Sequence, residues 1–423
     1  MNIKITRTNA LCGGIKLLVI ACLFAEYFLG TRRTDPLFLV ETIPSGGDGR
    51  ESVVREIGEP RLFFAENAPL SHSASLAELS DGRLMAVWYA GSREGAKDVK
   101  IYQAVFPASG QAENDSTVRV LLDRETLAQE TKRIIRKLGN PVIFSDQKRL
   151  RLWVVSVSFG GWSGSSLNEA VSDDDGQTWS AFRRLKTSPL LNLSNLVRAE
   201  AVPMTDQCVG LPVYHELIYK YSHFFVLDRA GKILRRSRIP ADEEGLQPTI
   251  AASDGKNALA LMRTGTTDKA RKILAAQTSD AGLTWQKLPS FPLSNLDSSV
   301  SLIRTPTGKF LAAANPAEGR MILNFFGANQ NDPLAWNLLA TLEKDEEHEY
   351  SYPSLLMSKN STVHLVYTWK RLGIKYRRFC MEPADELSGE PSDAPCTEPT
   401  DAPTVESAVD ACAEPVPAPQ SKE

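Results

Sequence analysis

Short apolar runs alternate with short polar turns through the middle of this chain. One unit has an apolar run at 75–79, the turn Asp81-Gly82 and a second apolar run from Leu84 to Trp88. Runs of about five residues on either side of such turn residues are typical of β-hairpins. The unit occurs six times between about Pro60 and Phe379. The pattern therefore predicts a repeated all-β structure.

The spacing of the turns gives the size of the repeat. The turns lie at residues 81, 146, 206, 254, 307 and 359, so successive turns are 65, 60, 48, 53 and 52 residues apart. A unit near fifty residues with several short strands is typical of a propeller blade. We therefore predict a six-bladed β-propeller over residues 60–380, closed by a strand from the segment before Pro60 or from the last blade.

A second motif is interleaved with the hairpins. The octapeptides Ser172–Trp179 and Thr278–Trp285 share the form S/T-x-D-x-G-x-T-W, and their tryptophans are 106 residues apart, or two repeats. Trp336 ends a degenerate copy 51 residues after Trp285. The Asp side chain can accept hydrogen bonds from the backbone amides of a tight turn, and the Gly can adopt the positive φ that such a turn needs. We expect the tryptophans to pack under their turns at the rim.

Composition changes this picture only through charge. The chain is 42% hydrophobic and 23% charged, an ordinary globular balance. Residues 381–423 carry eleven Asp or Glu and one Lys, a charge of -10, so a total of -3 leaves about +7 on the rest. A mildly positive body suits an acidic small substrate. No nucleic-acid-binding motif is present, and no CxxC pair suggests zinc. We expect no nucleic-acid partner, no metal and no cofactor.

The two ends differ from the body. Residues 1–33 contain an apolar stretch between basic residues, which predicts a signal peptide or a signal anchor, with a buried first helix as the alternative. We expect an exported protein, periplasmic or extracellular, with a possible membrane anchor. Residues 34–59 are predicted as a linker. Residues 381–423 hold eight prolines and predict a disordered acidic tail. The oligomeric state stays open.

The octapeptides resemble the Asp boxes of the sialidase (neuraminidase) superfamily. The chain is most similar to bacterial predicted neuraminidases with BNR-like repeats, and the segments that carry the likeness are 71–98, 211–216, 350–355 and 367–371. The resemblance implies a sialidase-like propeller with structural Asp boxes at its outer rim. It identifies a fold, and function has to be argued from the site.

Propeller topology predicts where the chemistry lies. Polar residues just before the first run and just after the second run of each blade should surround one central pocket. The residues that meet this rule are His72, Arg93, Glu94, Asp98, Asn140, Arg198, Glu200, Tyr214, His215, Glu216, Gln247, Arg263, Asp297, Ser298, Asn315, Tyr352, Lys370 and Arg371. Arginines, carboxylates, two histidines and tyrosines together suit binding or cleavage of an acidic sugar.

The resemblance supplies roles for some of these residues. Sialidases hold the substrate carboxylate with arginines, and Arg93 and Arg263 match two of those positions. Tyr352 matches the nucleophile and Asp98 matches the acid/base residue. Arg371 occupies the same position in its blade as Arg93 and Arg263. The remaining candidates for substrate contact are His215, Gln247 and Arg198.

Two positions depart from the sialidase pattern. His72-Ser73 stands where the first blade should supply an arginine, and His72 joins the catalytic candidates. Gln247 stands where a glutamate should deprotonate the tyrosine, a role that a neutral carboxamide cannot fill. Glu200 or Glu216 from the neighbouring blade is the candidate replacement.

Three functions follow from this inventory. The first is an exo-acting glycoside hydrolase of sialidase type that releases a terminal acidic sugar held by arginines. The second is a polysaccharide lyase acting on uronic acids, with a His/Tyr pair at the α-proton. The third is a glycan-binding propeller without catalysis. In each case the expected partner is a glycan or an acidic sugar.

Overall fold

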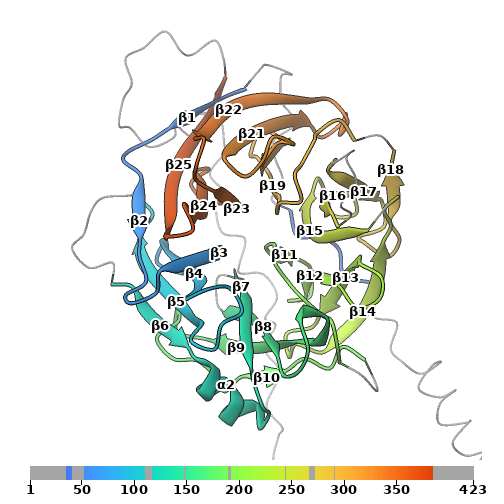
Figure 1. The fold of residues 1–423 in the computed structure, drawn as a ribbon. Helices are drawn as coiled ribbons and strands as arrows, with labels where there is room; N and C mark the ends of the chain where they lie inside the picture. Colours follow the sequence, from blue (N-terminus) through green and yellow to red (C-terminus); the bar gives the residue numbers. More distant parts are fainter. Residues whose placement is uncertain are drawn as a thin grey trace, which may run out of the picture. The chain divides into compact units, whose positions relative to one another are not determined.

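The predicted six-bladed β-propeller is confirmed by the computed structural model. It describes residues 35–40, 52–109, 117–146, 149–188, 192–242, 244–265, 272–289 and 291–383. Figure 1 shows six sheets arranged around one axis. The predicted signal segment 1–33 lies outside the described residues, and so does the predicted tail 381–423 except for residues 381–383, which form the end of a strand. In the described ranges, no helix has the length and apolarity needed to cross a membrane.

Each blade is an antiparallel sheet, and in blades 1 to 5 the strands follow one another along the chain. Blade 1 contains β3 (Leu70–Glu78), β4 (Arg83–Gly91), β5 (Lys100–Pro107) and β6 (Arg119–Leu122). Blade 2 contains β7 (Lys137–Ser145), β8 (Leu150–Val157), β9 (Ser165–Ser172) and β10 (Arg183–Arg184). Blade 3 contains β11 (Val202–Pro203), β12 (Val209–His215), β13 (Tyr221–Leu227) and β14 (Ile233–Ile239).

The second half of the ring repeats this order. Blade 4 contains β15 (Gly245–Ala252), β16 (Ala258–Thr264), β17 (Leu274–Thr278) and β18 (Gln286–Leu288). Blade 5 contains β19 (Ser301–Arg304), β20 (Lys309–Ala314), β21 (Ile322–Asn329) and β22 (Trp336–Lys344). Blade 6 contains β23 (Tyr350–Met357), β24 (Val363–Trp369), β25 (Gly373–Pro383) and β1 (Ser52–Glu56). One short α-helix, α2 (Arg124–Thr131), connects blades 1 and 2.

The hydrophobic core lies between neighbouring blades. Each pair of adjacent blades shares one cluster of buried side chains, so the core consists of successive clusters arranged around the ring. Trp153 of blade 2 packs with Phe225 of blade 3, and Trp88 of blade 1 packs with Tyr376 of blade 6. All four side chains are almost completely buried. Because every blade covers its neighbours, both faces of each sheet are apolar.

The ring closes through a strand from the N-terminal side, which is one of the two predicted alternatives. β1 pairs with β25 in register from Ser52↔Pro383 to Glu56↔Phe379. A further short strand, β2 (Arg61–Phe63), also pairs with β25. The interval 34–59, predicted as a linker, therefore contains a strand of blade 6. It also contains Phe38, which is 2% exposed and packs between blades 3 and 4. The interval is therefore part of the propeller, through the backbone pairing of β1 and through the burial of Phe38.

The two Asp boxes form the turns between the third and fourth strands of blades 2 and 4. Asp280 accepts hydrogen bonds from the amide of Thr284 at 2.9 Å and from its hydroxyl at 2.5 Å, and Asp174 does the same for Thr178. Gly282 has a φ of 77°. Trp285 is 7% exposed, whereas Trp179 is only half-buried. The boxes therefore fix blade turns by local hydrogen bonding.

Candidate active site

The innermost strands are irregular where they begin, close to the axis. A β-bulge interrupts the pairing of β3 after His72, of β15 after Leu246 and of β23 after Ser351. In the same places Ser73, Gln247 and Tyr352 have positive φ values of 61°, 50° and 54°. A bulge changes the direction of side chains, and left-handed backbone is costly for residues other than Gly. Such strain in three blades at one end of the ring marks that end as the candidate site.

Tyr352 lies at the centre of this site. Its phenol oxygen accepts a hydrogen bond from Nη1 of Arg263 at 3.2 Å. The guanidinium of Arg320 lies 5.3 Å from the centre of the ring, and that of Arg198 lies 5.2 Å from it. The imidazole of His72 is 4.2 Å from the ring, between centroids. Four residues from four other blades thus surround the ring of Tyr352, although they lie far apart along the chain.

Three arginines from consecutive blades are joined through two carboxylate residues. Arg263 forms an ion pair of 3.3 Å with Asp297, and Arg320 donates to the Asp297 carbonyl at 2.8 Å. Glu349 then pairs with Arg320 at 3.2 Å and with Arg371 at 3.1 Å. The sequence prediction included Arg263 and Arg371 but missed Arg320. The guanidinium groups are held in fixed positions, which suits recognition of a planar anion.

Charge around Tyr352 favours its ionised form. Burial raises the pKa of this phenol, but the positive charges of Arg263 and Arg320 and a hydrogen bond from Gln247 outweigh burial, so the net pKa lies below the usual value. The opposite holds for His72. Burial, followed by the charges of Arg371 and Arg320, holds the pKa of His72 well below its usual value. The histidine is therefore neutral near pH 7, and the phenol of Tyr352 loses its proton more readily than that of a free tyrosine.

Gln247 belongs to a buried polar group beside the phenol. Its amide nitrogen donates to the Tyr214 hydroxyl at 3.4 Å, and Asn140 donates to the same hydroxyl at 3.3 Å. The side-chain oxygen of Gln247 is buried and has no hydrogen-bond partner among the described residues. Burial raises the pKa of Tyr214, so this second phenol stays neutral. An unpartnered buried acceptor is costly, and a ligand hydroxyl or amide could satisfy it.

Glu216 is the predicted carboxylate with the most suitable environment for proton transfer. The residue is half-buried at the end of β12. Burial raises its pKa, and the charges of Arg263 and Lys220 oppose that shift without cancelling it. A carboxyl group with a raised pKa keeps its proton closer to neutral pH, as a general acid requires.

Asp98 and Arg93 lie on the exposed loop between β4 and β5. Asp98 accepts hydrogen bonds from the amide and the hydroxyl of Ser92, both at 2.9 Å. The hydrogen bond from the Ser92 hydroxyl is the main cause of its lowered pKa. Both predicted residues are exposed, and no described contact joins either of them to Tyr352. In this arrangement Asp98 stabilises its own loop.

Two other predicted residues use their side chains for contacts within the protein. His215 stacks on Tyr221, with ring centroids 4.5 Å apart, because side chains alternate along β12 and Tyr214 takes the inward position. Arg198 is 1% exposed, and its guanidinium donates to three main-chain carbonyls, those of Ala74, Tyr352 and Pro353. Arg198 therefore has little donor capacity left for a substrate.

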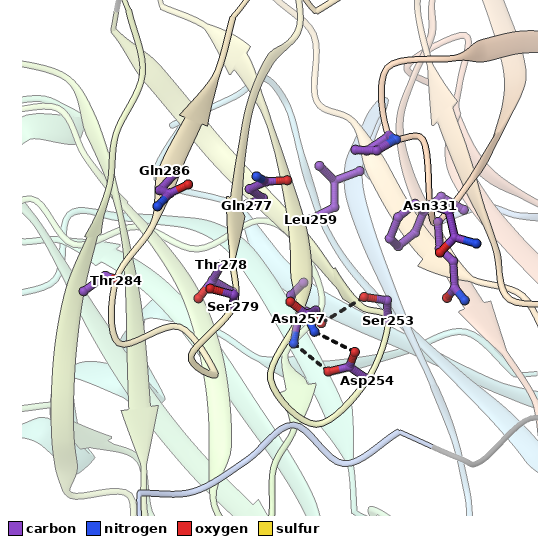
Figure 2. Close-up of a pocket in the computed structure, with 14 residues that line it drawn as sticks. Ser253, Asp254, Asn257, Leu259, Gln277, Thr278, Ser279, Thr284, Gln286 and Asn331 are labelled. Atoms are coloured by element: carbon purple, nitrogen blue, oxygen red, sulfur yellow. Dashed lines mark hydrogen bonds between the residues drawn. The ribbon is translucent and has the colours of Figure 1, made fainter.

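A separate groove of about 440 Å³ lies at the other end of blades 4 and 5. Figure 2 shows its lining, in which Asp254 and Asn257 form the turn between β15 and β16. Strand direction reverses along each blade, so this turn and the Asp boxes lie opposite the Tyr352 end. The groove contains none of the predicted site residues. Its volume therefore says nothing about the chemistry of Tyr352.

Comparisons with known proteins agree with the propeller fold. Residues 82–365 match the family described as "BNR repeat-like domain". The Hadza microbial sialidase Hz136 is similar in structure, with a TM-score of 0.61, 17% identity and coverage of 76% of this chain and 67% of that chain. The intramolecular trans-sialidase from Ruminococcus gnavus has a TM-score of 0.59, 14% identity and coverage of 78% and 98%. A protein of unknown function from Dyadobacter fermentans has a TM-score of 0.63, 12% identity and coverage of 78% and 99%. Among curated proteins, none matches significantly.

Proposed function

Since this chain belongs to the BNR repeat-like family and has the sialidase fold, we propose that it is an exo-acting glycoside hydrolase that removes a terminal acidic sugar. One observation carries the proposal. Arg263, Arg320 and Arg371 converge from three blades on the end of the ring where the Tyr352 phenol receives a hydrogen bond from Arg263. Three arginines at the end of the ring that holds a phenol of lowered pKa suit a sugar that has a carboxylate next to its reacting carbon.

The three arginines would bind the carboxylate of the sugar. A guanidinium presents parallel N–H donors that fit a carboxylate, and Asp297 and Glu349 keep the groups aligned. The partly buried Arg263 side chain is 12% exposed, so its contact with an anion would be only weakly screened by water. Sialic acid is the first substrate to test, since its carboxylate is attached to the anomeric carbon.

The chemistry would proceed in two displacements. The ionised Tyr352 oxygen attacks the anomeric carbon while Glu216 gives a proton to the departing glycosidic oxygen, so the bond to the aglycone breaks as the bond to the enzyme forms. Glu216, now ionised, then takes a proton from a water molecule whose oxygen attacks the same carbon, so the bond to Tyr352 breaks and the ionised phenol is restored. Because Gln247 cannot act as a base, activation of Tyr352 would depend on the charges of Arg263 and Arg320.

Replacing Arg263 with lysine tests the carboxylate contact. We expect Arg263→Lys to weaken binding of an acidic sugar by about 2–5 kcal/mol, because lysine keeps the charge but loses the planar fork. Binding of a neutral sugar of the same shape should hardly change. Calorimetric titration with a matched acidic and neutral pair gives the comparison.

Arg83→Lys is the control for this titration, since Arg83 is exposed at the opposite end of blade 1, where it pairs with Asp81 at 2.7 Å. It should leave both affinities unchanged. Equal losses for the acidic and neutral ligands in Arg263→Lys would refute the carboxylate contact.

The pH profile tests Glu216. A general acid must be protonated, so kcat should fall as pH rises through the raised pKa of Glu216. In Glu216→Gln this alkaline limb should disappear and kcat should fall about 100-fold. Asp98→Asn is the matched control, because the pKa of Asp98 is lowered and its ionisation cannot produce that limb. Loss of the limb in Asp98→Asn instead would transfer the acid role to Asp98.

A lyase acting on uronic acids is the second candidate, and the His72–Tyr352 pair favours it. The two rings are 4.2 Å apart, and the pKa of His72 is low enough for a neutral base. A lyase leaves a conjugated double bond in its product, whereas a hydrolase does not. Ultraviolet absorbance of the products from sialylated and uronate glycans separates the two reactions, and binding without either product indicates a lectin-like propeller.

A further inference from the structure

Arg198 is a fully buried arginine that bonds to blades other than its own. It precedes β11 in blade 3, yet its Nη1 donates to the Ala74 carbonyl of blade 1 at 3.2 Å. Its Nη2 donates to the carbonyls of Tyr352 and Pro353 in blade 6 at 2.5 and 3.0 Å. The side chain thus spans the axis and bonds directly to the backbone of the candidate nucleophile.

Blade 3 is built to supply this side chain. Its innermost strand is reduced to the two residues of β11 and a single bridge between Leu196 and Tyr214. The residues between this bridge and β11 do not pair with the sheet, and they include both Arg198 and Glu200. Glu200 accepts hydrogen bonds from the hydroxyls of Ser301 and Ser354 in blades 5 and 6. The negative charge of Glu200 also acts on Arg198, so the buried guanidinium has an opposite charge near it.

We propose that Arg198 is a positioning residue that holds the backbone of Tyr352 in its left-handed conformation and so keeps the phenol against Arg263. The two carbonyls that Arg198 binds in blade 6 belong to the two successive peptide bonds after Tyr352, inside the bulge between Ser351 and Ser354. Tyr352 has a φ of 54°, which a tyrosine adopts only where its surroundings impose it. Arg198 therefore bonds directly to the segment of blade 6 that has the costly conformation, and it also bonds the carbonyl of Ala74, which follows the positive-φ residue Ser73 in blade 1.

Titration of the Tyr352 phenol tests the proposal without any substrate. The phenol spectrum of Tyr352 is obtained as the absorbance difference between the parent protein and Tyr352→Phe, over a range of alkaline pH. The same difference is then measured in Arg198→Lys. If the phenol moves away from Arg263 and Arg320 while it stays buried, its titration should shift to higher pH, because burial alone raises its pKa.

Arg151→Lys is the control for loss of a buried guanidinium. Arg151 is also fully buried, and it pairs with Glu169 at 3.4 Å in blade 2. Both variants should lower the melting temperature, but only Arg198→Lys should move the phenol titration. An unchanged titration in a folded Arg198→Lys protein overturns the proposal, and so does an equal shift in Arg151→Lys.

A second variant covers the case in which the lysine protein does not fold. Arg198→Met combined with Glu200→Gln removes both buried opposite charges, and replacing a buried ion pair by neutral side chains of similar volume is often tolerated. It should shift the phenol titration in the same direction as Arg198→Lys. If neither variant folds, Arg198 is required for the fold itself, and a role limited to positioning Tyr352 is refuted.

The effect on turnover rests on the proposed function and is measured separately. With a fluorogenic sialoside as the probe, Arg198→Lys should lower kcat by about 100-fold and leave KM within about twofold, since a small displacement of a reacting group is costly. If the parent protein cleaves no sialoside, the proposed function fails, yet the titration still decides the positioning role.

Discussion

Tyr352→Phe is expected to lower kcat by roughly 10³-fold or more, because loss of a nucleophile removes the covalent route entirely. Binding of the acidic sugar should be retained, since the hydroxyl of Tyr352 is not part of the arginine contact with the carboxylate. Steady-state kinetics with a fluorogenic sialoside gives kcat, and calorimetric titration gives the affinity.

Tyr350→Phe provides the comparison for this experiment. Tyr350 lies two residues earlier on β23, and its hydroxyl donates to Asp345 at 2.8 Å. Removing that hydroxyl should leave kcat within a few-fold of the parent. A Tyr352→Phe protein with nearly normal turnover would exclude the phenol as nucleophile and would leave its hydrogen bond with Arg263 as a structural contact.

Trp285→Ala is expected to reduce the free energy of unfolding by about 3–5 kcal/mol without changing affinity for the sugar. Trp285 is 7% exposed and packs edge-on against Phe224 of blade 3, with ring centroids 5.8 Å apart. Its indole N–H has no hydrogen-bond partner among the described residues, so the loss comes from packing. Denaturant unfolding followed by tryptophan fluorescence and circular dichroism measures the change.

Trp336→Ala gives the matched measurement in a degenerate Asp box. Trp336 is only half-buried, and its indole nitrogen donates to the Pro333 carbonyl at 2.8 Å. Its replacement should cost less than that of Trp285, because less apolar surface is lost. An altered sugar affinity at unchanged stability in Trp285→Ala would contradict a purely structural role for the Asp box.

Local chemistry made the fold predictable from the sequence. In the second Asp box, Asp280 accepts a hydrogen bond from Thr284, only four residues away, so one short segment contains all the residues that determine the turn. Hairpins such as β3–β4 likewise close through the turn at Asp81-Gly82. The strand β1 was harder to predict, because its partner β25 lies over 300 residues away along the chain and only the need to close the ring pointed to it.

The site was only partly predictable, because its geometry depends on contacts between blades. His72, Arg263, Arg371 and Tyr352 were expected to converge, and the structure brings them to one end of the ring. Arg320 was missed because it lies six residues beyond the end of β20, whereas Arg371 follows β24 by two. A search of the whole loop between the second and third strands of each blade would have found it.

The left-handed backbone at Tyr352 had no sequence signal at all. Glycine normally marks a positive φ, but the residues here are Ser73, Gln247 and Tyr352. The hydrogen bond that we propose to hold Tyr352 in this conformation comes from Arg198, about 150 positions earlier in the chain. Strain supported from another blade cannot be recognised in the local sequence.

The pairing of β1 with β25 also determines how this protein can be shortened. β25 is eleven residues long, and β1 and β2 cover its outer edge. A chain that starts after Ile57 would leave the amide and carbonyl groups from Phe379 to Pro383 without partners, and such an exposed edge pairs readily with other molecules. A chain that ends at Cys380 would release Ser52 to Val54 in the same way. Fragments that keep both Ser52 and Pro383 should therefore remain monodisperse, whereas fragments cut inside either strand should self-associate.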